Sequence, residues 1–193
     1  MKVAIEKEHE NRLEFSVEGI TPTFANAIRR YAIARVPIIA IDQVTFYENS
    51  SYVFDEYLAH RVGQLPLKTP DKLSENAEIT LSLDATGPKL VSSKDLKSSD
   101  SQIVVVKDNV PIISLNEGQR LQFEGKAIVG RGRTHAKFQS GIVAYGIDEK
   151  TGKISFKVEG FYQMPIKELV IRACTQLEDD LVEMTKFLKK KSK

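Results

Sequence analysis

The stretch TPTFANAIRRYAIARVP, residues 21–37, has the signals of an amphipathic helix. Thr21 suits the N-cap position, Pro22 suits the first helical turn, and Pro37 ends the segment after about four turns. One face carries apolar residues that recur every three or four positions: Phe24, Ala27, Ile28 and Tyr31. Most such helices pack only against their own core, so periodicity alone leaves a core helix and a partner-binding helix both open.

Segments on both sides of this helix predict a sheet and a second, longer helix. Residues 12–18 alternate apolar and polar side chains, and residues 38–48 are rich in β-branched and aromatic residues. Residues 141–161 read as two strands joined by a tight turn. From Pro165 an apolar stripe runs through about six turns and predicts a long terminal helix: Ile166, Leu169, Val170, Ala173, Leu177, Leu181, Met184 and Leu188.

The middle of the chain is predicted to be mostly β. A short helix is expected over residues 51–62, where Phe54, Tyr57, Leu58 and Val62 fall at helical spacing. The strands expected after it cover residues 79–83, 103–107, 112–115, 119–124 and 126–129. The whole chain therefore predicts an α+β fold in two domains.

Composition narrows the class of protein. The 193 residues are 41% hydrophobic and carry a net charge of +2, which argues against a protein that coats nucleic acid or an anionic membrane. No apolar run reaches the roughly 20 residues of a membrane span, and no signal peptide is apparent. The single cysteine, Cys174, excludes an internal disulfide, and its place in the helical stripe predicts a buried, inert thiol. We expect a cytoplasmic protein.

The sequence contains no recognisable set of catalytic groups. His9, His60 and His135 are far apart and do not have metal-ligand spacing. No phosphate-binding loop, dinucleotide fingerprint or nucleophile elbow is present. The carboxylate pairs 55–56 and 179–180 are better explained as helix-end and exposed residues. A stand-alone enzyme is therefore disfavoured.

The basic segment GRGRTHAKF, residues 130–138, remains open in function. Its glycines expose backbone, while its Arg, His and Lys side chains donate hydrogen bonds to phosphate or carboxylate. An autonomous nucleic-acid-binding protein would use Arg131, Arg133 and Lys137, but it would also need a second basic strip and a stacking platform. Contact with another protein and a solvated loop are the alternatives.

Four segments, in order and spacing, resemble the D-type subunit family of archaeal RNA polymerase: FANAIRRYAIARVP (24–37), DEYLAHRVGQLPL (55–67), THAKF (134–138), and FKVEGF (156–161) with the terminal helix. This family is the counterpart of the third-largest subunit of eukaryotic polymerase II and of the N-terminal region of bacterial alpha. The resemblance covers essentially the whole chain. It implies a dimerisation domain at residues 1–47 and 146–193, interrupted by an insert domain at residues 48–145.

The resemblance also implies the partners. The chain would be a non-catalytic assembly subunit that forms a heterodimer with subunit L and then gathers the large catalytic subunits and other small subunits. Residues expected at the subunit L interface are Phe24, Ala27, Ile28, Tyr31, Leu169, Ala173, Leu177, Leu181 and Met184. Cations expected to dock a large subunit are Arg29, Arg30, His60, Arg61, Arg131, Arg133, His135 and Lys137.

No cofactor is expected in this chain. Some members of the family carry an iron–sulfur domain just before the strand that corresponds to residues 153–158, but here only the turn DEKTGK occupies that place. The zinc-binding cysteines of eukaryotic relatives are missing too. Magnesium would belong to the large subunits, and DNA would be met only through the assembled polymerase.

Overall fold

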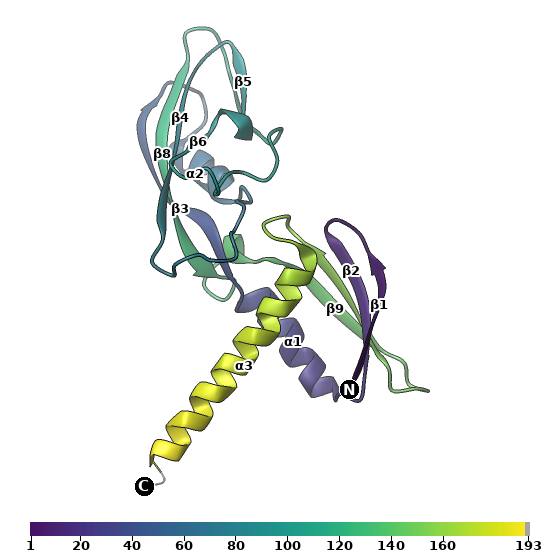
Figure 1. Ribbon diagram of the computed structural model, residues 1–193. Helices are drawn as coiled ribbons and strands as arrows, with labels where there is room; N and C mark the ends of the chain where they lie inside the picture. Colours follow the sequence, from purple (N-terminus) through teal and green to yellow (C-terminus); the bar gives the residue numbers. More distant parts are fainter. Residues whose placement is uncertain (192–193) are drawn as a thin grey trace. The chain divides into compact units, whose positions relative to one another are not determined.

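The computed structural model describes residues 1–191, which form an α+β fold with two compact units (Figure 1). The first, called here the helix–sheet unit, consists of residues 1–36 and the chain from residue 131 onward. The second, called the β-rich unit, consists of residues 37–130. The predicted α+β class is confirmed.

The boundaries between the two units differ from the predicted domain boundaries. The predicted limits, after residues 47 and 145, lie inside strands β3 (Pro37–Asn49) and β9 (Gly141–Ile147). β9 pairs with β10 along its whole length, and β3 is the sheet neighbour of β8, so each strand stays within one unit. The divisions therefore fall after residues 36 and 130. The roles predicted for the two domains stay a prediction.

In the helix–sheet unit, one antiparallel sheet is packed against two helices. The sheet order is β1-β2-β10-β9, and its remaining strands are β1 (Lys2–Glu8), β2 (Arg12–Glu18) and β10 (Ile154–Gly160). Its covered face is apolar, and the rings of Phe15 and Phe156 stack there with centroids 4.8 Å apart. β1 was not predicted; it is an edge strand whose residues are all exposed.

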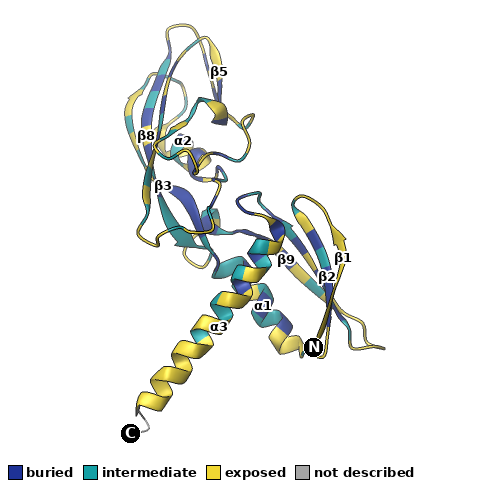
Figure 2. Ribbon diagram, in the orientation of Figure 1, coloured by how far each residue is buried: buried dark blue, intermediate teal, exposed yellow. Residues whose placement is uncertain are grey.

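The two helices of this unit agree with the sequence prediction. α1 (Pro22–Ala34) begins as predicted, because the Thr21 hydroxyl accepts a hydrogen bond from the Phe24 N–H at 3.2 Å. α3 (Ile166–Lys191) buries Ile166, Leu169 and Ala173 in its first turns. Residues 181–190 of α3 are exposed on all sides (Figure 2). No helix of the described part of the chain is long and apolar enough to cross a membrane.

The β-rich unit has its own apolar core between a four-stranded sheet, a two-stranded sheet and one helix. The sheets have the orders β3-β8-β4-β6 and β5-β7. Its further elements are α2 (Asp55–Gly63), β4 (Glu78–Thr86), β5 (Lys89–Ser92), β6 (Lys97–Ser98), β7 (Pro111–Leu115) and β8 (Arg120–Arg131). Fully buried side chains such as Leu58, Leu121 and Phe123 form its centre.

Two strand predictions in this unit were wrong. Residues 103–107 form no strand, and only Val105 makes an isolated bridge, to Leu67. The neighbouring Pro66 accepts from the Val106 N–H but has no N–H to return, so the ladder cannot extend. Gly125 was predicted to separate two strands, but β8 runs straight through it. A Cβ there would lie 3.0 Å from Cγ2 of Ile41, so the glycine permits close packing.

The helix predicted over residues 51–62 begins later, at Asp55. Leu58 and Val62 are buried as the helical spacing predicts. Phe54 is instead the N-cap residue, and it and Tyr57 are exposed.

Candidate functional site

An apolar groove of about 690 Å³ lies in the helix–sheet unit, lined by strands β1 and β2 and by both helices. Its lining includes Val3, Phe15, Phe24, Ile28, Leu177 and Leu181. β1 contributes because Val3 pairs with Val17 and Ile5 with Phe15, which places both β1 side chains on the apolar face. Val3 and Ile5 are 60% and 55% exposed, so this edge of the sheet is open to solvent. An open apolar surface of this kind is typical of a protein–protein contact.

The residues predicted to meet a partner differ in burial. Ile28, Leu169 and Ala173 are buried in the chain's own core. Ala27, Tyr31 and Leu177 are half-buried, and Phe24, Leu181 and Met184 are exposed. Five of the nine do not line the groove: Ala27, Tyr31, Leu169, Ala173 and Met184. Each helix therefore serves the core with some of these residues and presents others outward.

Tyr31 joins α1 to α3 within the chain. Its hydroxyl donates to Oδ2 of Asp180 at 2.8 Å, and this hydrogen bond raises the pKa of Tyr31. Gln176 Nε2 donates to the other Asp180 carboxylate oxygen at 3.1 Å. The Arg35 guanidinium lies 3.8 Å from Oδ2 of Asp180, and it also lies over the Tyr31 ring. Sequence reasoning missed this junction, because Asp180 was assigned to an exposed face and its partner lies 149 residues away.

Cys174 lies among the groove residues and is exposed, so the prediction of a buried thiol was wrong. Cys174 does lie beside the apolar stripe of α3, as the spacing indicates. However, this turn of α3 lines the groove, so the thiol is not covered by the core. Partial burial raises the pKa of the Cys174 thiol, which keeps it protonated at neutral pH. A protonated thiol is a weak nucleophile.

The basic segment after β8 is held against the C-terminal end of α1. The Arg133 N–H donates to the Ala34 carbonyl at 3.0 Å, and the Ser140 hydroxyl donates to the Ala32 carbonyl at 2.7 Å. A Cβ at Gly132 would clash with the Ile33 carbonyl oxygen. The loop thus satisfies carbonyls that a helix end leaves without partners. Gly132 is required for backbone packing rather than for cradling a phosphate.

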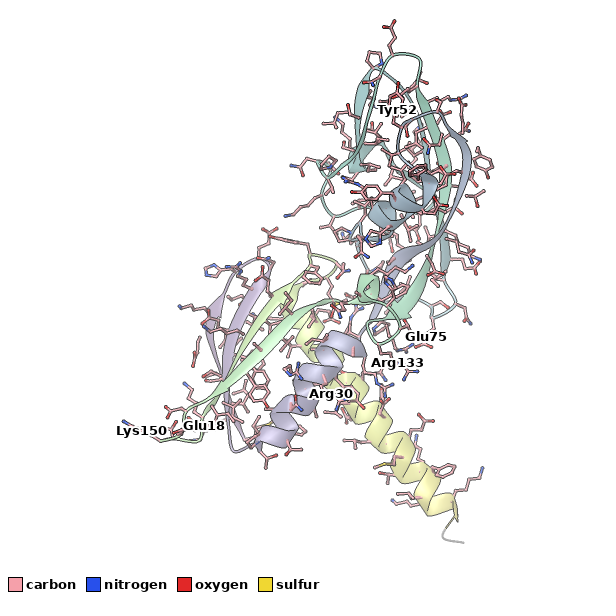
Figure 3. All side chains as sticks on the ribbon, turned by 180° about the vertical axis from the view of Figure 1, so that it is seen from behind. Glu18, Arg30, Tyr52, Glu75, Arg133 and Lys150 are labelled. Carbon is pink, nitrogen blue, oxygen red and sulfur yellow. The ribbon has the colours of Figure 1, made fainter. Side chains whose placement is uncertain are left out.

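The predicted docking cations are divided between the two units. Arg29, Arg30, Arg131, Arg133, His135 and Lys137 belong to the helix–sheet unit. The Arg29 guanidinium donates two hydrogen bonds to the Asn26 side chain, at 3.1 and 2.9 Å. Arg30 and Arg133 are exposed (Figure 3).

His60 and Arg61 belong to the β-rich unit, at the C-terminal end of α2. Arg61 donates to the Pro111 carbonyl at 2.7 Å and lies over the Tyr57 ring. They line a second hollow of about 420 Å³ with Leu65.

No group of three or more His, Cys, Asp or Glu side chains within the described residues is arranged to hold a metal ion. The expectation that this chain carries no cofactor stays a prediction.

Comparison with known proteins assigns the family. The sequence profile of the RNA polymerase Rpb3/RpoA insert domain matches residues 33–149, which include the entire β-rich unit. The chain belongs to the Rpb3/RpoA family. The predicted resemblance to an archaeal RNA polymerase subunit is confirmed.

Individual relatives agree. The chain is 43% identical to the DNA-directed RNA polymerase subunit Rpo3 of Pyrococcus horikoshii, over 85% of this chain and 66% of that protein. It is 45% identical to Rpo3 of Pyrococcus furiosus, over 75% of this chain and 58% of that protein. It is 43% identical to Rpo3 of Methanocaldococcus jannaschii, over 81% of this chain and 80% of that protein. The chain thus spans less than two thirds of the length of the two Pyrococcus relatives that it matches.

Proposed function

We propose that this chain is a non-catalytic assembly subunit of a DNA-directed RNA polymerase. The family match and the similarity to Rpo3 proteins support the polymerase. The apolar groove beside α1 and α3 is the single observation that supports a role in assembly. The site offers apolar contact rather than a set of catalytic groups, so catalysis would belong to other subunits.

In this proposal the helix–sheet unit forms the heterodimer with subunit L, and the β-rich unit is the insert that interrupts it. Phe24 and Leu181 would be central contacts, because both are apolar, exposed and part of the groove lining. Phe24 is 42% exposed and Leu181 is 48% exposed, so covering the remaining surface of each would stabilise a complex by about 1 kcal/mol per side chain. Ile28, Leu169 and Ala173 would act indirectly, by holding the helices in place.

The heterodimer would then gather the large catalytic subunits and the other small subunits. Arg29 and Arg30 on α1, with the cations of the basic segment and of α2, would set the orientation of those subunits. Magnesium would be bound by the large subunits, DNA would be met only through the assembly, and no iron–sulfur domain or zinc site would be needed here. Such an assembly would work in the cytoplasm.

Co-expression with subunit L from the same source tests the proposal. We expect a one-to-one complex by light scattering, and we expect Leu181→Asp to abolish it, because a charge would be buried without compensation. Ile171→Asp is a matched control, since Ile171 is an exposed apolar residue of α3 that does not line the groove. Monomers from the wild-type pair would contradict the proposal, and equal loss from both variants would contradict the groove assignment.

A nucleic-acid-binding role for the isolated chain is the competing function. It would rest on Arg131, Arg133 and Lys137, but the loop that carries them packs on the end of α1. Salt-dependent binding of DNA by the purified chain would favour it.

A further inference from the structure

The loop between β3 and α2 in the β-rich unit displays two aromatic side chains. Tyr52 is 87% exposed and Phe54 is 80% exposed, while Val53 between them packs against the core of the unit. Figure 3 shows Tyr52 at the surface of this unit. Alternation around an anchored Val53 therefore directs both rings outward. The core of the unit gains nothing from either ring.

Hydrogen bonds centred on Asn49 fix the shape of this loop. Asn49 Nδ2 donates to the Val53 carbonyl at 2.8 Å and to the Asp55 carboxylate at 2.7 Å. Asn49 Oδ1 accepts from the Ser51 hydroxyl at 2.6 Å and from its N–H at 3.1 Å. One side chain thus braces the loop on both sides of Tyr52.

A second set of bonds ties the loop to the sheet. The Ser50 N–H donates to the Arg120 carbonyl at 3.0 Å, and the Arg120 N–H donates to the Ser50 hydroxyl at 2.7 Å. The Arg120 guanidinium lies 3.2 Å from the Glu48 carboxylate and 2.8 Å from that of Asp84. The loop is consequently held at its start by a strand of the main sheet.

We infer that Tyr52 and Phe54 are anchors that insert into an apolar pocket on another protein subunit. Exposed aromatic rings on a loop whose backbone is already ordered lose little conformational entropy on binding. Aromatic anchors of this kind carry much of the binding energy of protein interfaces. The inference rests on the proposed function, because the partner would be another subunit of the polymerase.

The charges around the loop select the chemistry of the partner. Residues 48–57 include three carboxylates, Glu48, Asp55 and Glu56, and neither Lys nor Arg. Glu48 is paired with Arg120, so Asp55 and Glu56 are the carboxylates that make the surroundings of the two rings acidic. Asp55 and Glu56 disfavour stacking of the rings on nucleic-acid bases, since carboxylates repel phosphate. The same carboxylates favour a pocket whose rim carries Lys or Arg. The surface therefore fits a basic-rimmed protein pocket.

Hydroxyl-radical footprinting with mass spectrometry tests the inference on the free chain and on the assembled polymerase. We expect the oxidation rates of Tyr52 and Phe54 to fall several-fold in the polymerase without nucleic acid. Unchanged rates in the polymerase would overturn the inference alone. Protection that appears only after a DNA–RNA scaffold is added would overturn it in favour of base stacking. A chain that never enters the polymerase would contradict the proposed function as well.

Competitive assembly supplies a second measurement. The double variant Tyr52→Ser with Phe54→Ser should enter the polymerase at least about tenfold less efficiently than wild type. Leu90→Ser is the control, because Leu90 is a 61% exposed apolar residue of the same unit, on β5. Both variants should keep the wild-type melting temperature, since the altered side chains are exposed. Equal incorporation of the double variant and the control would overturn the inference.

Discussion

A glycine at position 132 lets the backbone after β8 lie directly against the last turn of α1. Any Cβ at this position would meet the Ile33 carbonyl oxygen, the Gln139 side chain and Cα of Ala34. The first and last of these are backbone atoms and cannot move aside without disturbing the helix end. The hydrogen bonds to the carbonyls of Ala32 and Ala34 depend on the same approach. One small residue therefore controls how the two halves of the helix–sheet unit meet.

Gly132→Ala is expected to destabilise the protein by about 1–3 kcal/mol, because the methyl group forces the loop away from α1. Chemical denaturation followed by circular dichroism measures the change. Gly146→Ala is the control, since a Cβ at Gly146 meets no atom within 4 Å. Equal stability of the two variants would show that the loop adjusts without cost.

At the scale of elements, α3 is one helix with two environments. Its first turns are buried against the sheet and α1, where Leu169 and Ala173 are 1% and 0% exposed. Asp180, near the middle of the helix, still contacts α1 through Tyr31. Residues 181–190 are exposed all round, although Leu181 and Met184 are apolar. No side chain of residues 181–190 is fully buried, and a helix end without buried side chains is marginal in water, so this half is expected to depend on a partner.

Hydrogen exchange should resolve these two halves. In the free chain we expect amides of residues 181–190 to exchange much faster than those of residues 169–177, because fraying costs little where no side chain is buried. Addition of subunit L should slow exchange in the second half and leave the first half nearly unchanged. Strong protection of residues 181–190 in the chain alone would contradict this prediction.

The long, strongly periodic elements could be predicted from the sequence because each buries one face, and a buried face requires apolar residues at regular spacing. Thr21 and the apolar stripes defined α1 and α3, and alternation defined β2 and β10. β1 was missed because Val3 and Ile5 are its only alternating large apolar residues and charged residues surround them in the sequence. As the edge strand of its sheet, β1 pairs only with β2. The strand predicted at residues 103–107 has the right composition, but Pro66 stops its neighbour from pairing further.

The candidate site was predictable only in part, because burial depends on neighbours that are distant in sequence. Periodicity placed Phe24, Leu177 and Leu181 on the faces that line the groove. It did not separate them from Leu169 and Ala173, which continue the same stripe but are covered by the chain itself. The partner proposed for this site comes from the family resemblance alone, because no spacing of residues indicates a partner.

At the scale of the whole molecule, the β-rich unit is one continuous segment with a core of its own. The helix–sheet unit, by contrast, combines residues from both ends of the chain. β3 and β8, which begin and end the β-rich segment, are neighbours in one sheet. Insertion of such a segment is tolerated because few contacts need to cross its boundaries.

Residues 37–130 expressed alone should therefore fold. We expect a cooperative thermal transition, with a free energy of unfolding of about 5–14 kcal/mol for a segment of this length. Leu121→Asp in the same fragment should remove the transition, because Leu121 is fully buried in the core and a carboxylate there has no partner. Leu90→Asp, at an exposed position, should preserve it. If the wild-type fragment unfolded without cooperativity, the helix–sheet unit would have to be part of its core, and the β-rich unit would not be an independent insert.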